Sequence, residues 1–525
     1  MVVVVALLLL LATVFTTAVS YYALPTRKNN LQRKNPPRPP SPPKLPVLGN
    51  LHQVGKFPYR TFARLAKQYN APLMLFRFGS RPIMIVSTSE AAREVMKVHD
   101  LITSDKPTFQ TGNRLLYGSR NIASTLYGEY WRQARRLCVL HLLSSRKVRA
   151  CCEVREEEVG LLVNRIKQHH HHQHQRAGGG ATAVNLSELL SRLANDVICR
   201  MAFGRKYDGG ANGGFRDLMV ELMSVLGAFN VGEFIPWLSW VNRVTGFDAR
   251  VDRVARRFDE FLEGTVLEGE ARLEKDGNKS ADSAGVIGDT QAPFIDILLH
   301  FQKDSSEEFQ LERDEVKAII MDMFLGGTDT TSTLMEWAMS ELVKHPRVMK
   351  KLQEELRSKI GRENETICEA DLDRLDYLAL VIKETIRLHP PIPMLSPRRL
   401  MQDTTMSGHD VSAGTMILTN AWAIGRDPVD WPESPEEFWP ERFLNTSVDF
   451  RGQDFQLIPF GAGRRGCPGI SFALAVVELA VANLVRSFDW ELPDGVAGED
   501  LDMSESVGIT AHRRLPLLAL PTIVF

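Results

Sequence analysis

A ten-residue loop near the C-terminus places one cysteine in a setting suited to chemistry. Residues Phe460–Gly469 read FGAGRRGCPG, so Cys467 stands among glycines, two arginines and a proline, directly before an apolar run that predicts a helix. Positive charge and a helix N-terminus both favour thiolate over thiol, and glycine permits close backbone approach to a flat ligand. Such a thiolate suits ligation of a soft metal centre. The alternative is a small buried apolar side chain.

A second reactive group lies in the middle of a long predicted helix, Glu312–Lys344, which Pro346 ends. The segment Gly326–Thr331 reads GGTDTT. Two glycines inside a helix cost about 2 kcal/mol relative to two alanines, so something should offset that cost. Either a neighbouring element packs closely against them, or the helix forms a groove over a planar ligand and admits dioxygen. In the second case Asp329 and Thr330 supply an acid and a hydroxyl that can relay protons.

Two further spacings place side chains of useful types on one helix face. Glu384 and Arg387, three residues apart in the predicted helix Tyr377–His389, can pair. Trp131 and Arg135, four residues apart, also share a face, and each offers N–H donors. Pairs of both kinds are common on solvated helices, where a tryptophan and an arginine often stack. Neither pattern is specific alone.

Composition agrees with a globular body. Apolar residues make up 44% and charged residues 24% of the 525 residues, and the net charge is −1 from 63 basic and 64 acidic side chains. This balance argues against a nucleic-acid partner. None of the six cysteines stands in a C-x-x-C pair, which disfavours a zinc site or a redox dithiol and is typical of reduced thiols facing the cytosol.

The N-terminal residues predict a membrane anchor. Residues 2–24 carry no charge and could form a helix of about 35 Å, enough to span a bilayer core. A cleaved signal peptide would want basic residues before the apolar run, but here they follow it, from Arg27 onwards. By the positive-inside rule that flank stays cytosolic. We therefore expect an anchor at 1–24, a basic and Pro-rich hinge at 25–50, and one catalytic domain at 51–525.

The rest of the chain predicts a mainly α fold with a small β component. Leu75–Gly79 and Pro82–Ser87 are short β-branched or aromatic runs around a turn, which indicates a hairpin. The histidine run at 169–174 leads into Ala177–Gly180 and predicts a solvated loop, as does the polar segment Gly277–Thr290.

Five motifs, in this order, make the chain similar to the cytochrome P-450 superfamily over nearly its whole length. They are W-x-x-x-R at 131–135, the hexapeptide at 326–331, E-x-x-R at 384–387, P-E-R-F at 440–443 and the cysteine loop at 460–469. The resemblance implies a mainly α fold with a small β-sheet subdomain, and haem b held between the long central helix and the cysteine loop.

The resemblance also implies roles for individual residues. Asp329 and Thr330 would be catalytic. Glu384, Arg387 and Arg442 would form a buried ionic triad that holds the cysteine loop in register. Haem would be bound by Cys467, as the metal ligand, and by Trp131, Arg135, Arg398, Arg465, Phe460 and Gly463.

Short sequence segments such as Tyr127–Gln133 and Asn420–Pro428 resemble those of the plant A-type microsomal group of specialised metabolism. This implies a monooxygenase that hydroxylates or otherwise oxidises a small hydrophobic plant metabolite. It would use O2 and electrons from NADPH through NADPH–cytochrome P-450 reductase, which would dock near Arg132, Arg136 and Arg464. The enzyme would be a single-pass protein of the endoplasmic reticulum membrane with its catalytic domain facing the cytosol.

Two alternatives remain open at this point. Some relatives use the haem thiolate without O2, as isomerases or aldoxime dehydratases, although the threonine pair at 330–331 favours a monooxygenase. A non-catalytic haem module, such as a gas sensor, would be expected to carry an appended output domain. The substrate pocket expected from the resemblance is mostly apolar and draws on 108–126, 203–236, the helix before Gly326, 392–396 and 506–509.

Overall fold

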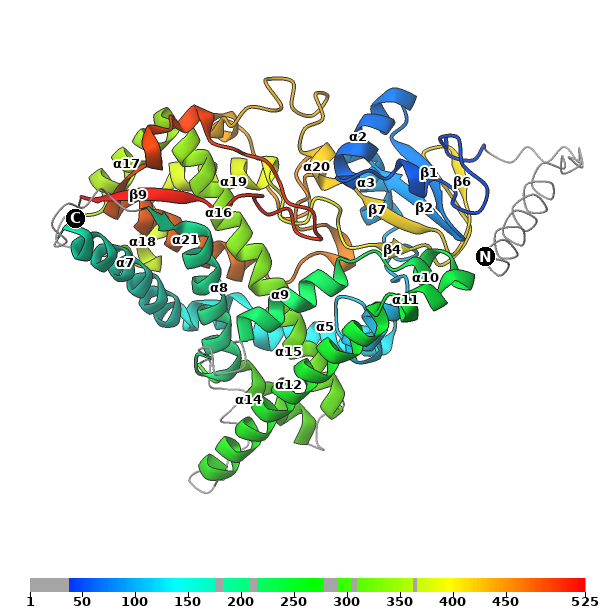
Figure 1. Ribbon diagram of the computed structural model, residues 1–525, viewed down its shortest axis with the longest axis horizontal. Coiled ribbons are helices and arrows are strands. Elements are labelled where there is room, and N and C mark those ends of the chain that lie inside the picture. The colour runs from blue at the N-terminus through cyan, green and yellow to red at the C-terminus, as the bar shows by residue number, and fades with distance from the viewer. Residues whose placement is uncertain are drawn as a thin grey trace, which may run out of the picture.

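The protein was analysed as a computed structural model that describes residues 37–174, 183–207, 215–277, 291–303, 309–361 and 366–524. The predicted anchor at 1–24 and the first part of the hinge lie outside the described residues, as do 278–290. Nineteen described helices form most of the body (Figure 1). They are α2 Pro58–Tyr69, α3 Ser89–Arg93, α4 Gln110–Leu115, α5 Glu129–Leu137, α6 Ser145–Ala150, α7 Cys152–His174, α8 Leu186–Phe203, α9 Phe215–Leu226, α10 Val231–Phe234, α11 Trp240–Val244, α12 Phe247–Gly277, α14 Phe294–Lys303, α15 Arg313–Gly327, α16 Asp329–Lys344, α17 Pro346–Lys359, α18 Glu369–Leu372, α19 Asp376–Leu388, α20 Ala421–Ile424 and α21 Ile470–Ser487.

The strands form small sheets at the edges of this helical body, which confirms the mainly α fold. The largest sheet has the order β1–β2–β7–β4 and lies beside α2 and α3, away from the C-terminal strand β9 (Figure 1). Its first two strands are the predicted hairpin, antiparallel, with Leu73 opposite Val86. The strands are β1 Leu73–Phe78, β2 Arg81–Val86, β3 Val184–Asn185, β4 Arg398–Arg399, β5 Thr404–Met406, β6 His409–Val411, β7 Met416–Thr419, β8 Phe488–Glu491 and β9 Leu518–Ile523.

The long predicted helix at the centre is two helices, α15 and α16, joined at Thr328. Glu312 and Glu315 form a capping box that starts α15, and Pro346 follows the end of α16. Thr328, directly after the glycine pair, keeps right-handed helical dihedral angles at the edge of the helical range (φ −89°, ψ −64°), so the interruption is a local distortion. Because α16 packs against α8, α19 and α21, the break lies in the middle of the core.

The described part of the Pro-rich hinge contacts both the large sheet and the two-stranded sheet β5–β6. The carbonyl of Pro40 accepts a hydrogen bond from the Leu75 amide (2.8 Å), and the Pro37 carbonyl accepts one from the Asp410 amide (3.0 Å). The Asn50 side chain then ties the end of the segment to Pro42 and Arg77. These contacts fix the direction in which the chain leaves the body.

The histidine run differs from the prediction. Residues 169–174 continue α7 as its last turns instead of forming a loop, and 175–182 lie outside the described residues. Once a helix has formed, adding a residue costs far less than starting a new helix. The preceding amphipathic residues therefore extend helical structure into a sequence with little preference of its own.

Candidate functional site

The cysteine loop lies between the start of α21 and the segment around residue 100. Gly463 adopts φ +66°, and a side chain there would overlap the Met96 carbonyl and the Asp100 carboxylate. The glycine is therefore required by packing against protein. The Phe460 ring packs edge-on against Phe450, with centroids 5.7 Å apart. The turn leaves Cys467 exposed to solvent, although its neighbours at 460–470 are mostly half-buried.

The environment of the Cys467 thiol opposes ionisation more than the sequence suggested. Burial within the surrounding protein raises the pKa of the thiol, while the Gly469 amide, 3.4 Å from the sulfur, and the charge of Arg135 lower it. The expected lowering is wrong because Arg464 turns to Asp100 and Arg465 turns to backbone carbonyls. A thiol that is both accessible and deeply surrounded is expected for a side chain that lines an internal space.

The two glycines of the central helix lie in different surroundings, which explain the absence of a side chain in different ways. A Cβ at Gly327 would lie 2.8 Å from Cδ1 of Ile198 and 3.5 Å from the Phe472 ring, so this residue lets α15 pack tightly against α8 and α21. A Cβ at Gly326 would meet no described atom within 4 Å, and the residue is exposed although its helix crosses the core. Phe472 lies in the first turn of α21, directly after the cysteine loop. Close packing therefore accounts for Gly327, and the open space at Gly326 leaves room for the predicted groove, which stays a prediction.

This difference predicts the outcome of alanine substitution. We expect Gly326→Ala to raise the free energy of unfolding by about 0.5–1 kcal/mol, since the methyl group meets no atom and helix propensity improves. In Gly327→Ala the Ile198 side chain must move, so that gain should be offset. Urea unfolding of the two variants measures the difference, and destabilisation by Gly326→Ala would contradict the open space at this position.

Cationic side chains gather beside the cysteine loop. Burial first, and then repulsion from Arg398, lower the pKa of Arg465 to about 9. Lys106 is 4% exposed, and burial followed by repulsion from Arg465 and Arg398 lowers its pKa well below the ordinary range. The acids that contact this cluster, Asp100 and Asp105, are shared with further arginines. The cationic side chains of this cluster are partly desolvated and are not fully neutralised by the nearby acids. The cluster therefore suits a ligand that carries carboxylates.

The four predicted propionate-binding residues lie together, but each also contacts the protein. Arg465 lies over the Trp131 ring (4.2 Å from guanidinium carbon to centroid), and the Trp131 N–H donates to the Ile122 carbonyl at 3.2 Å. Arg398 donates to the Ala462 carbonyl (2.6 Å) and Arg135 to that of Gly466 (2.5 Å). Because the tryptophan N–H is already engaged, its role as a haem donor stays a prediction.

These observations meet the requirements of haem. An accessible cysteine, a helix with open space at Gly326 and an excess of buried cations correspond to its iron, its flat ring and its propionates. Three apolar side chains from the segments expected to form the pocket are likewise exposed: Leu126 (50%), Val507 (61%) and Ile509 (40%). The residues present therefore fit the group.

The acid of the hexapeptide has a partner that the sequence did not reveal. One carboxylate oxygen of Asp329 lies 3.1 Å from Nε2 of His512, in the segment after the predicted pocket turn. Burial opposes ionisation, but the hydrogen bond and charge of His512 lower the pKa of Asp329 overall. Thr330 donates its hydroxyl to the Gly326 carbonyl at 2.5 Å. The acid and the hydroxyl thus stand at the start of α16, beside the glycine that faces open space.

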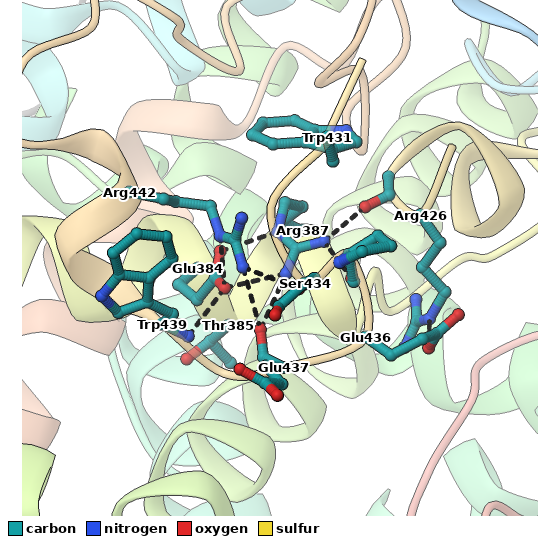
Figure 2. Close-up of polar contacts among 12 residues, drawn as sticks. Glu384, Thr385, Arg387, Arg426, Trp431, Ser434, Glu436, Glu437, Trp439 and Arg442 are labelled. Carbon is teal, nitrogen blue, oxygen red and sulfur yellow. Dashed lines mark hydrogen bonds and ion pairs between the residues drawn. The ribbon is translucent and has the colours of Figure 1, made fainter. Parts of the chain in front are cut away.

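The predicted ionic triad is formed (Figure 2), and its Glu384–Arg387 pair is fully buried. Both Glu384 and Arg387 have 0% side-chain exposure, and they make two hydrogen bonds of 2.7 and 2.8 Å. Arg442 donates to the same carboxylate at 2.9 Å. The remaining guanidinium N–H groups donate to the main-chain carbonyls of residues 425, 433, 434, 435 and 437. The triad therefore fixes the coil before P-E-R-F onto α19.

Removing the central carboxylate should be costly. We expect Glu384→Gln to destabilise the fold by about 3–5 kcal/mol, because Arg387 would stay buried without its counter-charge. Urea unfolding and the yield of haem-loaded protein measure this effect. Glu268→Gln is the matched control, since Glu268 pairs with Arg205 at the surface (51% and 55% exposed), where such pairs contribute about 1 kcal/mol or less. Equal destabilisation by the two substitutions would contradict the role of the triad.

Sequence reasoning missed three residues of this region. Lys106 precedes a proline in a loop, and no local pattern marks it as part of a cation cluster. His512 is far from Asp329 in the chain. Asp322, one turn before Gly326, accepts hydrogen bonds from the Asn121 side chain (2.6 Å) and the Ala123 amide (3.0 Å), and burial raises its pKa to about 6. The apolar spacing of α15 could have drawn attention to this buried acid, but not to its partners.

Comparison with known proteins agrees with this site. The family model for Cytochrome P450 matches residues 39–518. Cytochrome P450 71A1 of Persea americana is 48% identical over 89% of this chain and 90% of its own. The (+)-menthofuran synthase of Mentha piperita is 44% identical, with 94% and 95% covered, and the norfluorocurarine oxidase of a Strychnos species is 46% identical, with 95% and 93% covered.

Solved structures agree as well. A zebra fish cytochrome P450 with progesterone superposes with a TM-score of 0.70 at 26% identity, covering 89% of this chain and 99% of that one. The curated relatives are plant enzymes, and the family and its solved members are haem-thiolate enzymes. The chain is therefore a member of the cytochrome P450 family, from its plant group of specialised metabolism, and haem b is its cofactor.

Proposed function

We propose that this protein is a membrane-anchored monooxygenase that hydroxylates a small hydrophobic plant metabolite with O2 and electrons from NADPH. Two observations together support the proposal: Cys467 is accessible, and there is open space at Gly326. The two positions lie on neighbouring elements, because Gly327 packs against Phe472 at the start of α21. Asp329 and Thr330 follow directly on the same helix. An acid and a hydroxyl at this place favour oxygen activation, although an aldoxime dehydratase can keep the same residues.

Each residue group has a distinct task in this proposal. Cys467 binds the iron. Arg135, Arg398, Arg465 and Trp131 hold the propionates, with Lys106 contributing charge. When bound, haem supplies the activation of dioxygen and the oxidation of an unactivated carbon. Asp329 and Thr330 then pass protons toward the reacting oxygen, and the apolar pocket excludes bulk water and holds the substrate in place.

The substrate we propose is uncharged and apolar. The exposed side chains expected to line the pocket, Leu126, Val507 and Ile509, offer no ionic partner. Among the relatives, the printed names of a menthofuran synthase and a norfluorocurarine oxidase point to small molecules of plant specialised metabolism. We therefore expect a terpenoid, alkaloid or phenylpropanoid of modest size.

A surface patch supports attachment to a membrane. Leu45, Leu48, Phe229, Trp237 and Trp240 are between 41% and 64% exposed. The two chain segments that carry these side chains lie close together, because the turn at Gly79 and Ser80 binds both of them. The Gly79 amide donates to the Leu48 carbonyl, and the Ser80 amide donates to the Phe234 carbonyl. Large aromatic side chains on the surface favour the interface of a bilayer. We propose that this patch rests on the endoplasmic reticulum membrane, facing the cytosol, beside an anchor at 1–24.

The described helices do not provide that anchor. By length and composition α21 could cross a membrane, as could the strongly bent pair Phe215–Phe234 with Pro236–Val244. However, 72% of the apolar window of α21 is buried in the core. Deleting residues 1–24 should therefore move most of the protein from the microsomal pellet to the soluble fraction, with haem retained. Any protein that stays in the microsomal pellet would be held there by the surface patch. Full retention in the pellet would contradict the predicted anchor at 1–24.

A spectral screen tests the function. Purified protein is mixed with limonene, cinnamyl alcohol, an uncharged indole alkaloid and phenylacetaldoxime, and binding is followed by the shift of the ferric Soret band. The best ligand is then incubated with NADPH–cytochrome P-450 reductase. We expect an oxygenated product that requires both NADPH and O2. Turnover of an aldoxime in their absence would instead favour a dehydratase. The reductase should dock through the exposed arginines Arg132, Arg136 and Arg464, so charge reversal there should raise its apparent KM.

A further inference from the structure

His512 contacts Asp329 in a way that fixes the number of protons between them. Its Nδ1 lies 2.8 Å from the Thr333 hydroxyl, and its Nε2 lies 3.1 Å from a carboxylate oxygen of Asp329. The Thr333 hydroxyl is also 2.7 Å from the Asp329 main-chain carbonyl, which can only accept. If the hydroxyl donates to that carbonyl, its oxygen must accept from Nδ1. Nδ1 then carries a hydrogen.

The other ring nitrogen faces the carboxylate, so one more proton is required. With Nδ1 protonated, the contact between Nε2 and Asp329 is a hydrogen bond only if a proton lies between them. Either the imidazolium donates to a carboxylate, or a carboxylic acid donates to a neutral imidazole. Both arrangements contain the same number of protons. The pair therefore retains one transferable proton at this end of α16.

The surrounding charges support this count. The acids facing the ring are Asp329 and Glu336, both on α16, and the nearest cation along the chain is Arg513. Burial lowers the pKa of His512, but the hydrogen bond and charge of Asp329, followed by the charge of Glu336, raise it overall. These interactions therefore favour the protonated form of the ring.

A small pocket lined by both polar and apolar side chains reaches the same carboxylate from another direction. It lies between α8, α9 and the start of α16, and Ser191, Asn195, Thr328, Asp329 and Ser332 are among its lining residues. The volume open to water centres is about 40 Å³, which is room for about three water molecules. Three buried lining atoms make no hydrogen bond with another described residue: Asn195 Oδ1, Thr328 Oγ1 and Asp329 Oδ2. Buried polar atoms without protein partners beside such a space call for water.

We propose that His512 and Asp329 store one proton for oxygen activation, and that water in this pocket replaces it after delivery. The Nε2–H bond of His512 breaks as the proton passes to Asp329, and the resulting carboxylic acid gives a proton toward Thr330. The pair is left as neutral imidazole and carboxylate. A proton from bulk solvent then passes along the pocket water to Oδ2 of Asp329, each water giving up one proton and receiving another, and Nε2 recovers a proton from the carboxyl group. No redox step is involved, and His512 acts as a positioning residue for Asp329.

The first test is spectroscopic and needs no substrate. The full-length protein, labelled at the nitrogens of its 13 histidines, is studied as the diamagnetic reduced carbon monoxide complex. The His512 signal is assigned by its loss in His512→Gln. We expect both ring nitrogens to be protonated at neutral pH, with a pKa above the ordinary value for a histidine and lower in Asp329→Asn. A ring with one protonated nitrogen and an unshifted pKa would overturn the proposal.

The second test uses the ratio of product formed to NADPH oxidised, with the best ligand of the spectral screen. The inference rests on the proposed monooxygenase, so Asp329→Asn comes first: if that variant keeps the full ratio, the proposed proton relay itself fails. Otherwise His512→Gln and His512→Arg should both lower the ratio at least tenfold while ferric binding spectra stay unchanged, and His52→Gln should not. The arginine keeps a charged donor but gives up no proton at neutral pH.

Full coupling in His512→Arg would show that charge alone is sufficient and would overturn the proton store. If His512→Gln folds poorly, His512→Arg and the spectroscopic measurement still test whether the pair stores a proton. Asn195→Leu should fill part of the pocket and lower the ratio under steady turnover without changing the titration of His512. An unchanged ratio in Asn195→Leu would remove the pocket from the route.

Discussion

Cys467→Ser should abolish monooxygenase turnover and the red-shifted Soret band of the reduced carbon monoxide complex. A serine hydroxyl stays protonated at neutral pH and is a harder ligand than sulfur, so it does not replace a thiolate on iron. The side chain is exposed and its neighbours are backbone atoms and Arg135, so the fold should survive the change of one atom. The two readouts are the carbon monoxide difference spectrum and the haem content per protein.

The control for this substitution is Cys152→Ser, a half-buried cysteine on α7. It should leave the spectrum and turnover as in the wild type. Retention of the red-shifted band in Cys467→Ser would mean that another residue binds the iron and would refute the assignment of the loop. Loss of the band in both variants would indicate a general effect on folding.

Thr330→Ala should separate NADPH consumption from product formation. The hydroxyl donates to the Gly326 carbonyl and stands next to Asp329, so its loss leaves the fold and the ferric binding spectra largely intact. Removal of a positioned proton donor typically costs about 10²–10⁴-fold. Product formation should fall by about that factor at most, while NADPH is still oxidised and hydrogen peroxide is released. The measured quantity is product formed per NADPH oxidised, with reductase in excess.

A matched control exists for the local structure of this threonine. Thr245 makes the same hydroxyl bond to the carbonyl four residues earlier, 2.9 Å to Val241, on the exposed helix α11. Thr245→Ala should keep the ratio of product to NADPH. An unchanged ratio in Thr330→Ala, with normal turnover, would exclude this hydroxyl from oxygen activation and favour a reaction that consumes no O2.

Local patterns predicted the elements that frame the site. The hairpin at β1 and β2, the helix α19 and the extent of α15 and α16 follow from side-chain periodicity and from turn or proline residues within a few positions. The pairing of Glu384 with Arg387 is local as well. Arg442 came from the resemblance, and the structure brings it to the same carboxylate.

Contacts between distant segments could not be predicted in this way. Lys106 meets Ser396, and Asp329 meets His512, across long stretches of chain whose approach depends on the packing of the whole core. The close approach of Gly327 to Ile198 likewise joins segments far apart in the chain, and no periodicity encodes it. The direction of the Cys467 pKa was wrong for a related reason: sequence gives the proximity of Arg464 and Arg465 but not the direction in which their guanidinium groups point.

The triad also bears on how this part of the chain tolerates evolutionary change. Between α20 and P-E-R-F, Arg387 and Arg442 hold the coil at 433–437 only by its carbonyl oxygens, which every amino acid provides. The triad thus places no demand on the side chains there, although Glu436 pairs with Arg426 (2.9 Å) and Ser434 adopts a positive φ. Insertions and deletions are not tolerated, since losing one residue would shift each carbonyl away from its guanidinium partner. The coil should therefore drift in sequence while keeping its length, and lysine at 387 or 442 should be selected against because it lacks the planar set of donors.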